Sequence, residues 1–451
     1  MKRRDLGKAF FSNPARILVL GFAVVIMLGT ALLILPAASR NQQSVGMINA
    51  LFTATSAVCV TGLVVVDTGT HWTTFGKSVI AVLIQVGGLG FMSMATLFAV
   101  ILGKRITLKE RLIIQQAVGQ ETLSGVVRFS LYLLSLALVV QSLGILLLSF
   151  RFVPEYGITT GMGFAVFHAI SAFCNAGFDL IGEGRSLTPY VQDPLVSLTV
   201  GFLIILGGLG FTVILDTLSH LKKFRVTLHT RLVLVITVVL LTAGTVIFLI
   251  LEWNNPATLG QLPLRSKLLA GFFQSLTTRT AGFNTIDTAS LTTASQVWTI
   301  ILMFIGGSPA STAGGIKTIT FGVMLILALS VIQGKENVEV FERRIPFDIV
   351  NRAITIFVIG MVMLMSATMA LSILETEFSF LQILFEVTSA FGTVGLSTGI
   401  TPLLGNPGKV LLIATMFVGR VGTLTIAFAL ARKQNRYQNL VHYPRERIIV
   451  G

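Results

Sequence analysis

SAVCVTGL (Ser56–Leu63) is the most informative segment of the sequence, because the chain repeats it in related form three more times. All four copies align without gaps on a glycine, and these glycines are 115, 105 and 113 residues apart. Self-similarity at a nearly constant spacing indicates a repeated structural unit. The other copies are SAFCNAGF (Ser171–Phe178), LTTRTAGF (Leu276–Phe283) and SAFGTVGL (Ser389–Leu396), and the aligned glycines are Gly62, Gly177, Gly282 and Gly395.

Each copy occupies the same place in a longer hydrophobic pattern. A full apolar span comes first, near 14–36, 126–150, 231–252 and 350–374. Next comes an apolar segment of about 10–12 residues, such as MINALFTATSAV, which is too short to cross a bilayer. After the glycine, a second full span carries another glycine motif: GGLGF at Gly87 and Gly207, GGSPAS at Gly306 and GRVG at Gly419. Each unit is therefore interpreted as span, re-entrant half-helix, glycine loop and span.

We expect an all-α polytopic membrane protein with eight transmembrane helices and four pore helices around a pseudo-fourfold central pore. Non-helical backbone at membrane depth is tolerated only where it lines a water-filled cavity or is buried in protein. The alternative is that each glycine only packs one helix against another. This is improbable because all four copies occur in the same sequence context. The predicted repeats are 14–102 (loop 59–63), 126–218 (loop 174–178), 229–332 (loop 279–283) and 350–431 (loop 392–396), followed by a cytoplasmic C-terminal tail at 432–451.

Composition and charge agree with a membrane protein. The chain is 53% hydrophobic and 12% charged, with a mean hydropathy of +0.86. Its net charge of +14 is concentrated in alternate loops: segments 1–16, 103–111, 220–231, 333–352 and 432–447 hold 22 Lys and Arg residues, and the intervening segments hold 8. This asymmetry places both termini in the cytoplasm and the protein in the cell membrane. It also disfavours a nucleic-acid role, and the two cysteines, Cys59 and Cys174, form no disulfide framework or metal-binding spacing.

The glycine loops have the chemistry of a cation filter. Backbone carbonyls directed at an axis replace the hydration shell of a cation, and successive carbonyls turn to one side only with backbone angles that glycine adopts without strain. Half-helices directing their C-terminal ends at the cavity would favour cations. TVG at Thr393–Gly395 matches the start of the potassium-filter pattern TVGYG. With one glycine per loop, the predicted filter is short: Val60, Thr61, Gly62, Asn175, Ala176, Gly177, Thr280, Ala281, Gly282, Thr393, Val394 and Gly395, binding K+ only through carbonyls.

These motifs together resemble the Trk/Ktr/HKT superfamily of potassium transporters, most closely its bacterial Ktr-type membrane subunit, over nearly the whole chain. The resemblance implies K+ as substrate, Na+ as an activator, and a homodimer in membrane lipid with one pore per chain. It also implies a cytoplasmic ring of nucleotide-binding (RCK-type) regulatory subunits that carry the ATP or ADP. No GxGxxG follows a strand in this sequence, so such a nucleotide domain belongs to another polypeptide. Sodium-selective members often carry serine at the first filter glycine, and Gly62 favours potassium.

GGSPASTAGGIK (Gly306–Lys317) interrupts the second span of the third unit with small, hydrogen-bonding residues of low helix propensity. A helix kinked at Pro309 is the simpler interpretation. The resemblance implies instead an intramembrane gate below the filter, in which Lys317 places a positive charge near the ion route and Arg420 of the last span holds the segment closed. An ion pair of Arg420 with Glu386 is the alternative, since an intramembrane arginine usually faces a cavity or a partner. The predicted gate residues are Gly306, Gly307, Ser308, Pro309, Ala310, Ser311, Thr312, Ala313, Gly314, Gly315, Lys317 and Arg420.

Three further residues have expected structural roles. His168 and Glu386 lie nine residues before their glycines, where we expect them to anchor the pore helices, and Arg279 is expected to brace the third loop. A secondary symporter coupling K+ to Na+ or H+ remains the alternative function, because broken helices near the midplane also suit transporters. An enzyme is not expected: His168 and Ser171 share a helix face, but no other segment supplies an oxyanion hole or metal ligands.

Overall fold

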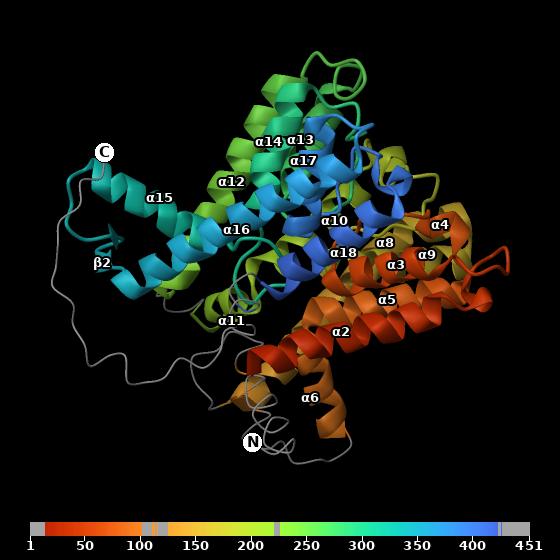
Figure 1. The fold of residues 1–451 in the computed structure, drawn as a ribbon, viewed down its shortest axis with the longest axis horizontal. Helices are drawn as coiled ribbons and strands as arrows, with labels where there is room; N and C mark the ends of the chain where they lie inside the picture. The colour runs from red at the N-terminus through yellow and green to blue at the C-terminus, as the bar shows by residue number, and fades with distance from the viewer. Residues whose placement is uncertain are drawn as a thin grey trace.

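Long and short helices form two classes in the computed structural model, which describes residues 14–101, 111–112, 115, 125–220, 226–422 and 425 (Figure 1). The long helices are apolar enough to cross a membrane, with mean hydropathy from 2.3 to 2.9, yet only 22–33% of their most apolar windows is buried. Such helices present apolar side chains outward, as lipid-facing helices do. They are α2 (Pro14–Leu33), α8 (Val126–Tyr156), α12 (Leu228–Glu252) and α16 (Phe347–Leu374).

The short helices that lead into the four glycines are buried at the centre. They contain 13 to 16 residues, and at a rise of 1.5 Å per residue they are about 20–24 Å long, less than the roughly 30 Å of a bilayer core. The last three residues of each are buried, including serines and threonines. These helices match the half-length segments expected from the sequence. They are α3 (Met47–Cys59), α9 (Ile158–Phe173), α13 (Leu264–Thr277) and α17 (Phe380–Gly392).

The helix after each glycine loop begins beside the end of the preceding long helix and is tied to it by hydrogen bonds. In the third case Glu252, at the end of α12, accepts hydrogen bonds from the backbone and hydroxyl of Thr292, at 2.9 and 2.8 Å. In the fourth, Glu375 accepts from the Gly405 backbone at 2.8 Å. Each short helix therefore lies between a long helix before it and a second helix after it in the chain. The tied helices are α5 (Thr74–Leu89), α10 (Pro194–Leu209), α14 (Thr293–Phe304) and α18 (Asn406–Val421).

The expectation that the GGLGF motifs lie within continuous spans is wrong. The helix ends at Leu89 and at Leu209, and it resumes after Gly90 and Gly210, which have φ of 81° and 92°. The axes of α10 and α11 differ by 93°. Left-handed glycines end helices because no β-carbon opposes that conformation. The resumed helices are α6 (Phe91–Ile101), α11 (Phe211–His220) and, after the 306–317 segment, α15 (Thr318–Ile332).

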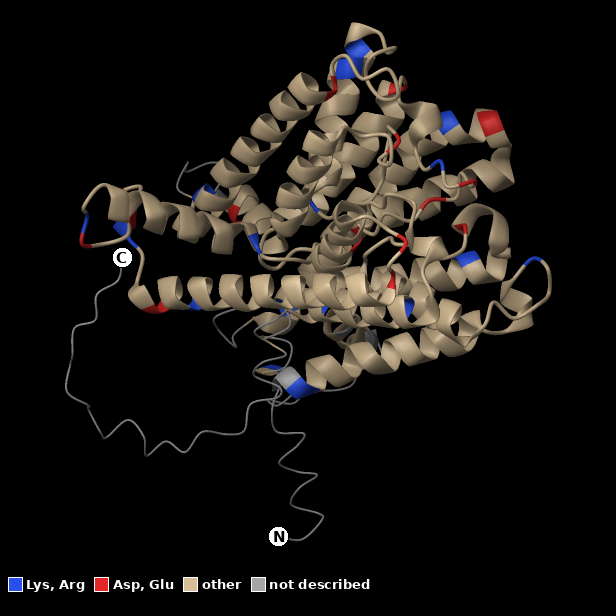
Figure 2. Cartoon of the chain, turned by 45° about the horizontal axis from the view of Figure 1, so that its top comes forward, with Lys and Arg blue, Asp and Glu red and all other residues tan. Residues whose placement is uncertain are grey.

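By length and composition, four helices of the described residues can cross a membrane, or five when α10 and α11 are one bent span. The chain is thus a multi-pass membrane protein, and the count of eight remains a prediction. Charged residues lie mainly at helix ends and in connections, which leaves the long helices largely free of them (Figure 2). The predicted tail at 432–451 lies outside the described residues, as do residues 102, 423–424 and 426–431 of the predicted repeats.

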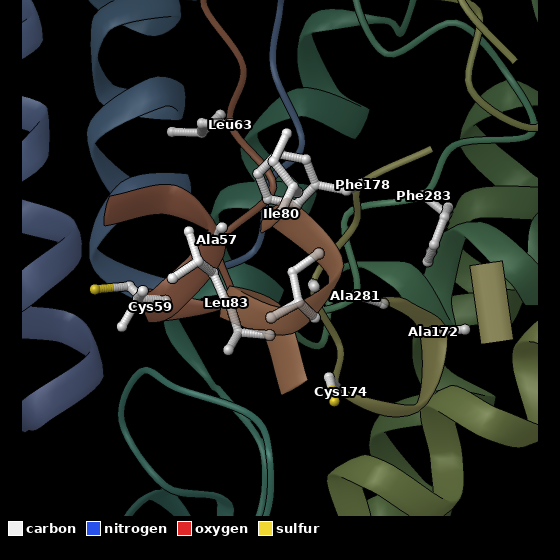
Figure 3. Packing of buried hydrophobic residues seen from close by; sticks show 14 of the residues in the cluster. Ala57, Cys59, Leu63, Ile80, Leu83, Ala172, Cys174, Phe178, Ala281 and Phe283 are labelled. Carbon is white, nitrogen blue, oxygen red and sulfur yellow. The ribbon is translucent and has the colours of Figure 1, made fainter. Parts of the chain in front are cut away.

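Smaller elements complete the connections between the helices. A two-stranded antiparallel hairpin pairs Glu339 with Arg344 and Val340 with Arg343, and it joins α15 to α16 at the end farthest from the other helices (Figure 1). The main apolar core surrounds the glycine loops and includes Ala281 of the third loop, together with Cys59 and Cys174, which directly precede the first and second loops (Figure 3). The remaining elements are η1 (Pro36–Ala38), α4 (Thr68–His71), η2 (Thr188–Tyr190), β1 (Glu339–Val340), β2 (Arg343–Arg344) and η3 (Thr401–Leu403).

Candidate ion pathway

The four glycine loops, defined as residues 60–62, 175–177, 280–282 and 393–395, follow the same backbone path. In each, the first residue has a φ between 50° and 67°, and the glycine has a φ between 68° and 91°. The glycines adopt this left-handed conformation freely, whereas β-branched residues do so only under strain. The four loops that are related in sequence thus also share one backbone conformation. The left-handed first residues are Val60, Asn175, Thr280 and Thr393.

The four glycines form a closed ring in chain order. A β-carbon added to Gly62 would lie 3.1 Å from Cα of Gly177, and one added to Gly177 would lie 2.8 Å from Cα of Gly282. The ring continues from Gly282 to Gly395 at 3.3 Å and returns from Gly395 to Gly62 at 3.1 Å. A side chain has no room at any of these positions. Segments more than 100 residues apart in the sequence therefore meet around one point.

Hydroxyl groups of the short helices fix the loops. Ser56 and Ser389 each accept a hydrogen bond at 3.0 Å from the backbone N–H of the glycine six residues later. In the second loop Ser171 instead donates to the Phe178 carbonyl at 2.7 Å, and in the third Thr277 donates to the Phe283 carbonyl. The sequence interpretation did not identify these groups, although the SA dipeptide shared by three copies was a visible signal.

His168 and Glu386, which we expected to anchor their own helices, instead bind the segments that follow the second and fourth glycines. The backbone N–H of Leu180 donates to Nε2 of His168 at 3.4 Å, and Nδ1 of that ring lies 2.8 Å from the Phe164 carbonyl. This pattern fits the neutral tautomer with the proton on Nδ1. The Glu386 carboxylate accepts hydrogen bonds from the hydroxyls of Ser397, Thr398 and Thr401 and from the backbone N–H of Thr398.

A cavity of about 210 Å³ lies against all four ring glycines on one side, bordered by the loops that follow them. Three carboxylates line it: Asp67, Asp179 and Asp287. Burial, together with the negative charge of Asp67, raises the pKa of Asp179 to about 6. Clefts lined by one sign of charge concentrate counter-ions, so this cavity favours cations at neutral pH. The sequence interpretation did not select these aspartates, because each stands alone in its loop.

The 306–317 segment is a closed loop between α14 and α15. Its ends are joined where the Gly306 N–H donates to the Ile316 carbonyl at 2.8 Å. It lies against the second and fourth glycine loops. Thr312 donates through its hydroxyl to the Phe173 carbonyl at 3.2 Å and through its N–H to the Gly207 carbonyl at 3.1 Å. A β-carbon on Gly315 would lie 3.2 Å from the Gly392 carbonyl oxygen. The simple kinked helix is therefore wrong: this backbone leaves the helix entirely and packs among the glycine loops.

Arg420, near the end of α18, holds the middle of this segment. Its guanidinium donates to the backbone carbonyls of Thr312, Gly87 and Gly88, the last at 3.2 Å. The expected contact with the 306–317 segment is thus present. The alternative partner, Glu386, is occupied by hydroxyl and backbone donors instead. The arginine ties α5, α18 and the segment together.

A second cavity, of about 220 Å³, adjoins the 306–317 segment and touches none of the four ring glycines. Lys317 and Arg420 line it, with Gly88, Ser311 and Ala313. The Lys317 ammonium donates to the Ala313 carbonyl at 2.6 Å. Acidic side chains thus line the first cavity and basic side chains the second. The cavity against the glycine ring therefore has the sign of charge that attracts cations, and the cavity beside the segment has the opposite sign.

Comparison with known proteins agrees with that geometry. The sequence matches the TrkH family, described as a cation transport protein, over residues 9–440. The chain belongs to this family. Two relatives of this TrkH-family chain align over 97% of both lengths: the Ktr system potassium uptake protein B of Bacillus subtilis (strain 168), at 44% identity over 439 residues, and the potassium/sodium uptake protein NtpJ of Enterococcus hirae, at 43% over 442 residues. The family and these relatives are transporters and not enzymes, as expected.

The fold of the TrkH-family chain also has a solved counterpart. The crystal structure of the potassium transporter TrkH from Vibrio parahaemolyticus matches with a TM-score of 0.74, covering 93% of this chain and 85% of that chain. The two sequences are 18% identical. At that identity the match establishes the polytopic helical fold and nothing finer.

Close backbone approach explains the second glycine motif of this TrkH-family chain. A β-carbon on Gly87, Gly207 or Gly419 would collide with the backbone carbonyl of Val58, Phe173 or Phe391, respectively. Each of these carbonyls belongs to the residue four positions before a ring glycine. The motif therefore lets a helix backbone pass directly against the end of a short helix, while the following glycine ends that helix. The sequence interpretation located these glycines and did not predict either role.

Proposed function

We propose that the protein is the potassium-translocating membrane subunit of a Ktr-type uptake system. The closed ring of Gly62, Gly177, Gly282 and Gly395 carries this proposal. Left-handed backbone at two of every three loop residues would turn carbonyl oxygens toward a common axis, where the twelve loop residues would replace part of the hydration shell of a cation. The acidic outer cavity would concentrate cations at the entrance to this filter.

The filter proposed here is short, because each loop contributes one glycine. Its residues are the twelve expected from the sequence, and Gly62 rather than serine supports preference for K+. The chain is proposed to consist of four repeats of long helix, pore helix and following helix, with boundaries as predicted. Both termini are assigned to the cytoplasm from the distribution of Lys and Arg.

The gate in this proposal is the 306–317 segment, held by Arg420. Its position beside the basic cavity, against the ends of the short helices before the second and fourth ring glycines, supports this role. Ions leaving the filter would meet the segment and then the positive charges of Lys317 and Arg420. Opening would require the segment to leave its hydrogen bonds to Phe173, Gly207 and Arg420. Such a small, glycine-rich loop is suited to alternate backbone conformations.

The partners proposed are a second copy of the chain and a cytoplasmic ring of nucleotide-binding regulatory subunits. The word "system" in the names of the Ktr relatives supports a multi-component assembly. Na+ is proposed as an activator, a role consistent with the potassium/sodium name of the Enterococcus hirae relative. ATP or ADP would bind the partner subunit.

The test is K+ uptake in cells that lack their own uptake systems, at submillimolar and millimolar K+, with and without Na+. Growth and uptake restored only in the presence of Na+ would support the sodium-activated route. Uptake restored without Na+ would support the proposed K+ pore and contradict the proposed role of Na+ as an activator. Absence of uptake, even with a nucleotide-binding partner supplied, would contradict potassium as the ion.

A secondary symporter coupling K+ to Na+ or H+ is the second candidate, favoured by the helix breaks at Gly90 and Gly210, since transporters place broken helices at their substrate sites. The two candidates differ in their driving force. A current that reverses at the K+ equilibrium potential identifies a channel-like route. A reversal potential that moves with the Na+ or H+ gradient identifies coupling.

A further inference from the structure

Arg279 is a buried cation, and the proposed ion path does not explain its position. It lies three residues before Gly282, where the other loops have Cys59, Cys174 and Gly392, and its exposure is 8%. Among the described residues, no carboxylate forms an ion pair with it, and its guanidinium donates one hydrogen bond, from Nη2 to the hydroxyl of Thr318 at 3.1 Å. A buried guanidinium without a counter-ion is unfavourable in itself, so this contact is the evident reason for its position.

Thr318 is where the two ends of the 306–317 segment meet. Its hydroxyl donates to the Gly306 carbonyl at 3.0 Å, and its N–H donates to the Gly307 carbonyl, also at 3.0 Å. The same hydroxyl accepts the hydrogen bond from Arg279. One guanidinium thus connects the third glycine loop to both ends of the segment through a single side chain.

The surroundings of Arg279 leave it room to move. A cavity of about 20 Å³ adjoins it, lined by Thr237 of α12, Gly307 and apolar side chains of α10, α12 and α13. The Nε of Arg279 and the hydroxyl of Thr237 both lack a partner among the described residues. A space of this size holds one water molecule. Arg420, by contrast, donates to three carbonyls on two elements, so the link through Arg279 is the looser of the two attachments.

We propose that Arg279 is a positioning residue that latches the ends of the 306–317 segment to the third glycine loop and so favours the closed segment. This inference rests on the proposed gate function and assigns it a second attachment, separate from Arg420. Arg420 fixes the middle of the segment from α18. Arg279 fixes its ends from the loop that borders the ion, which links the state of the filter to the state of the gate.

The test compares Thr318→Val with Thr318→Ser in the full-length protein, purified and reconstituted in vesicles, by K+ flux. Valine keeps the shape of threonine and removes the hydroxyl, whereas serine keeps the hydroxyl. We expect the valine variant to raise the maximal flux about tenfold, the value of one hydrogen bond to a charged group, with the half-saturating K+ concentration unchanged. The serine variant should restore the flux of the unmodified protein. A merely structural defect would not give this split between maximal rate and half-saturation, nor rescue by serine.

A second arm uses Arg279→Lys, alone and combined with Thr318→Val. If the two residues act through one hydrogen bond, the double variant should exceed neither single variant by more than about twofold, because effects on a shared interaction are not additive. Independent multiplication of the two effects would overturn the latch. Size-exclusion chromatography shows whether the Thr318→Val variant folds. If it does not fold, Arg279→Lys alone tests the proposal, and a flux equal to that of the unmodified protein would overturn it.

Arg420→Ala in the same vesicles separates this inference from the gate itself. Raised flux in Arg420→Ala with unchanged flux in Thr318→Val would overturn the latch and leave the gate in place. Unchanged flux in both variants would overturn the proposed gate, and the latch with it.

Discussion

Val60, Thr280 and Thr393 are β-branched residues in the left-handed region, a conformation in which such side chains are rare. A strained backbone of this kind costs about 1–3 kcal/mol per residue and persists only where the surroundings enforce it. Here the enforcement is visible: hydroxyls of the short helices fix the loops, and the ring glycines pack against one another. Strain at the same position of three loops is a mark of a functional site, and it supports the proposed filter.

At Gly62 a side chain would test that assignment directly. We expect Gly62→Ser to lower K+ uptake at least tenfold, since a β-carbon there would lie 3.1 Å from Cα of Gly177 at a φ of 88°. Gly46→Ser is a matched control, because Gly46 has a φ of 86° and nothing within 4 Å of its added β-carbon. Uptake should be measured for both at equal surface expression. Equal losses in the two variants would assign the effect to backbone strain alone and contradict the ring.

We expect Asp179 to make K+ uptake depend on external pH. Since burial and Asp67 raise its pKa from 3.8 to about 6, this carboxyl is charged at pH 7.5 and becomes neutral as the pH falls through about 6. Loss of one negative charge at the entrance should lower uptake about two- to threefold at subsaturating K+. Asp179→Asn should show the lower rate at every pH, without this step. The control, Glu183→Gln, removes an exposed carboxylate that does not line the cavity and should retain the step.

The ring glycines could be predicted from the sequence because they occupy a conformation and a space that exclude other residues, and this constraint leaves a visible repeat. The left-handed residues two positions earlier could not, because Val60 and Thr393 are typical of strands rather than turns. The aspartates of the outer cavity were missed for a different reason. They come together only in three dimensions, from loops that share no pattern.

At the scale of elements, the third unit differs from the others by the insertion of a packed loop where α5 and α10 end at glycine. Because the loop contacts the ends of the short helices before the second and fourth ring glycines and is held by Arg420, we expect removal of that attachment to open the proposed path. We expect Arg420→Ala to raise basal K+ flux at least tenfold, since it loses charge-assisted bonds to three carbonyls. Arg420→Lys should have a smaller effect, because lysine keeps the charge and lacks the planar fork.

Deletion of residues 311–314 is the complementary change at this scale. It removes Thr312, the residue that joins the segment to Phe173 and Gly207, and it should raise basal flux as Arg420→Ala does. Flux is to be followed in vesicles without a regulatory partner, with a vesicle lacking protein as the baseline. Unchanged flux in both the deletion and Arg420→Ala would contradict the gate.

The elements themselves were largely predictable, since hydrophobic length distinguishes the long helices from the short ones. The bend at Gly210 was not, because GGLGF is apolar throughout and its hydropathy resembles that of a continuous span. What interrupts the helix is a left-handed glycine together with a neighbouring backbone that only glycine can approach. Neither condition changes the hydropathy.

For the whole molecule, the positive-inside asymmetry predicts which loops face outward. In a background with Cys59→Ala and Cys174→Ala, a new cysteine replacing the exposed Arg185 should react with an impermeant maleimide in intact cells. A cysteine replacing Lys335, in the connection between α15 and β1, should react only after permeabilisation. The reverse labelling pattern would contradict the assigned orientation.

The closed ring of glycines determines how many positions of the ring a single mutation can change. In a pore assembled from four identical chains, every mutation appears four times, and no quadrant can differ from its neighbours. Here one polypeptide supplies all four quadrants in chain order, so a mutation alters only one of them. One quadrant of the proposed filter can therefore acquire a gate segment, a buried arginine or a new polar contact while the other three keep their ion-binding carbonyls. Mutation can therefore alter the proposed selectivity and gating one quadrant at a time.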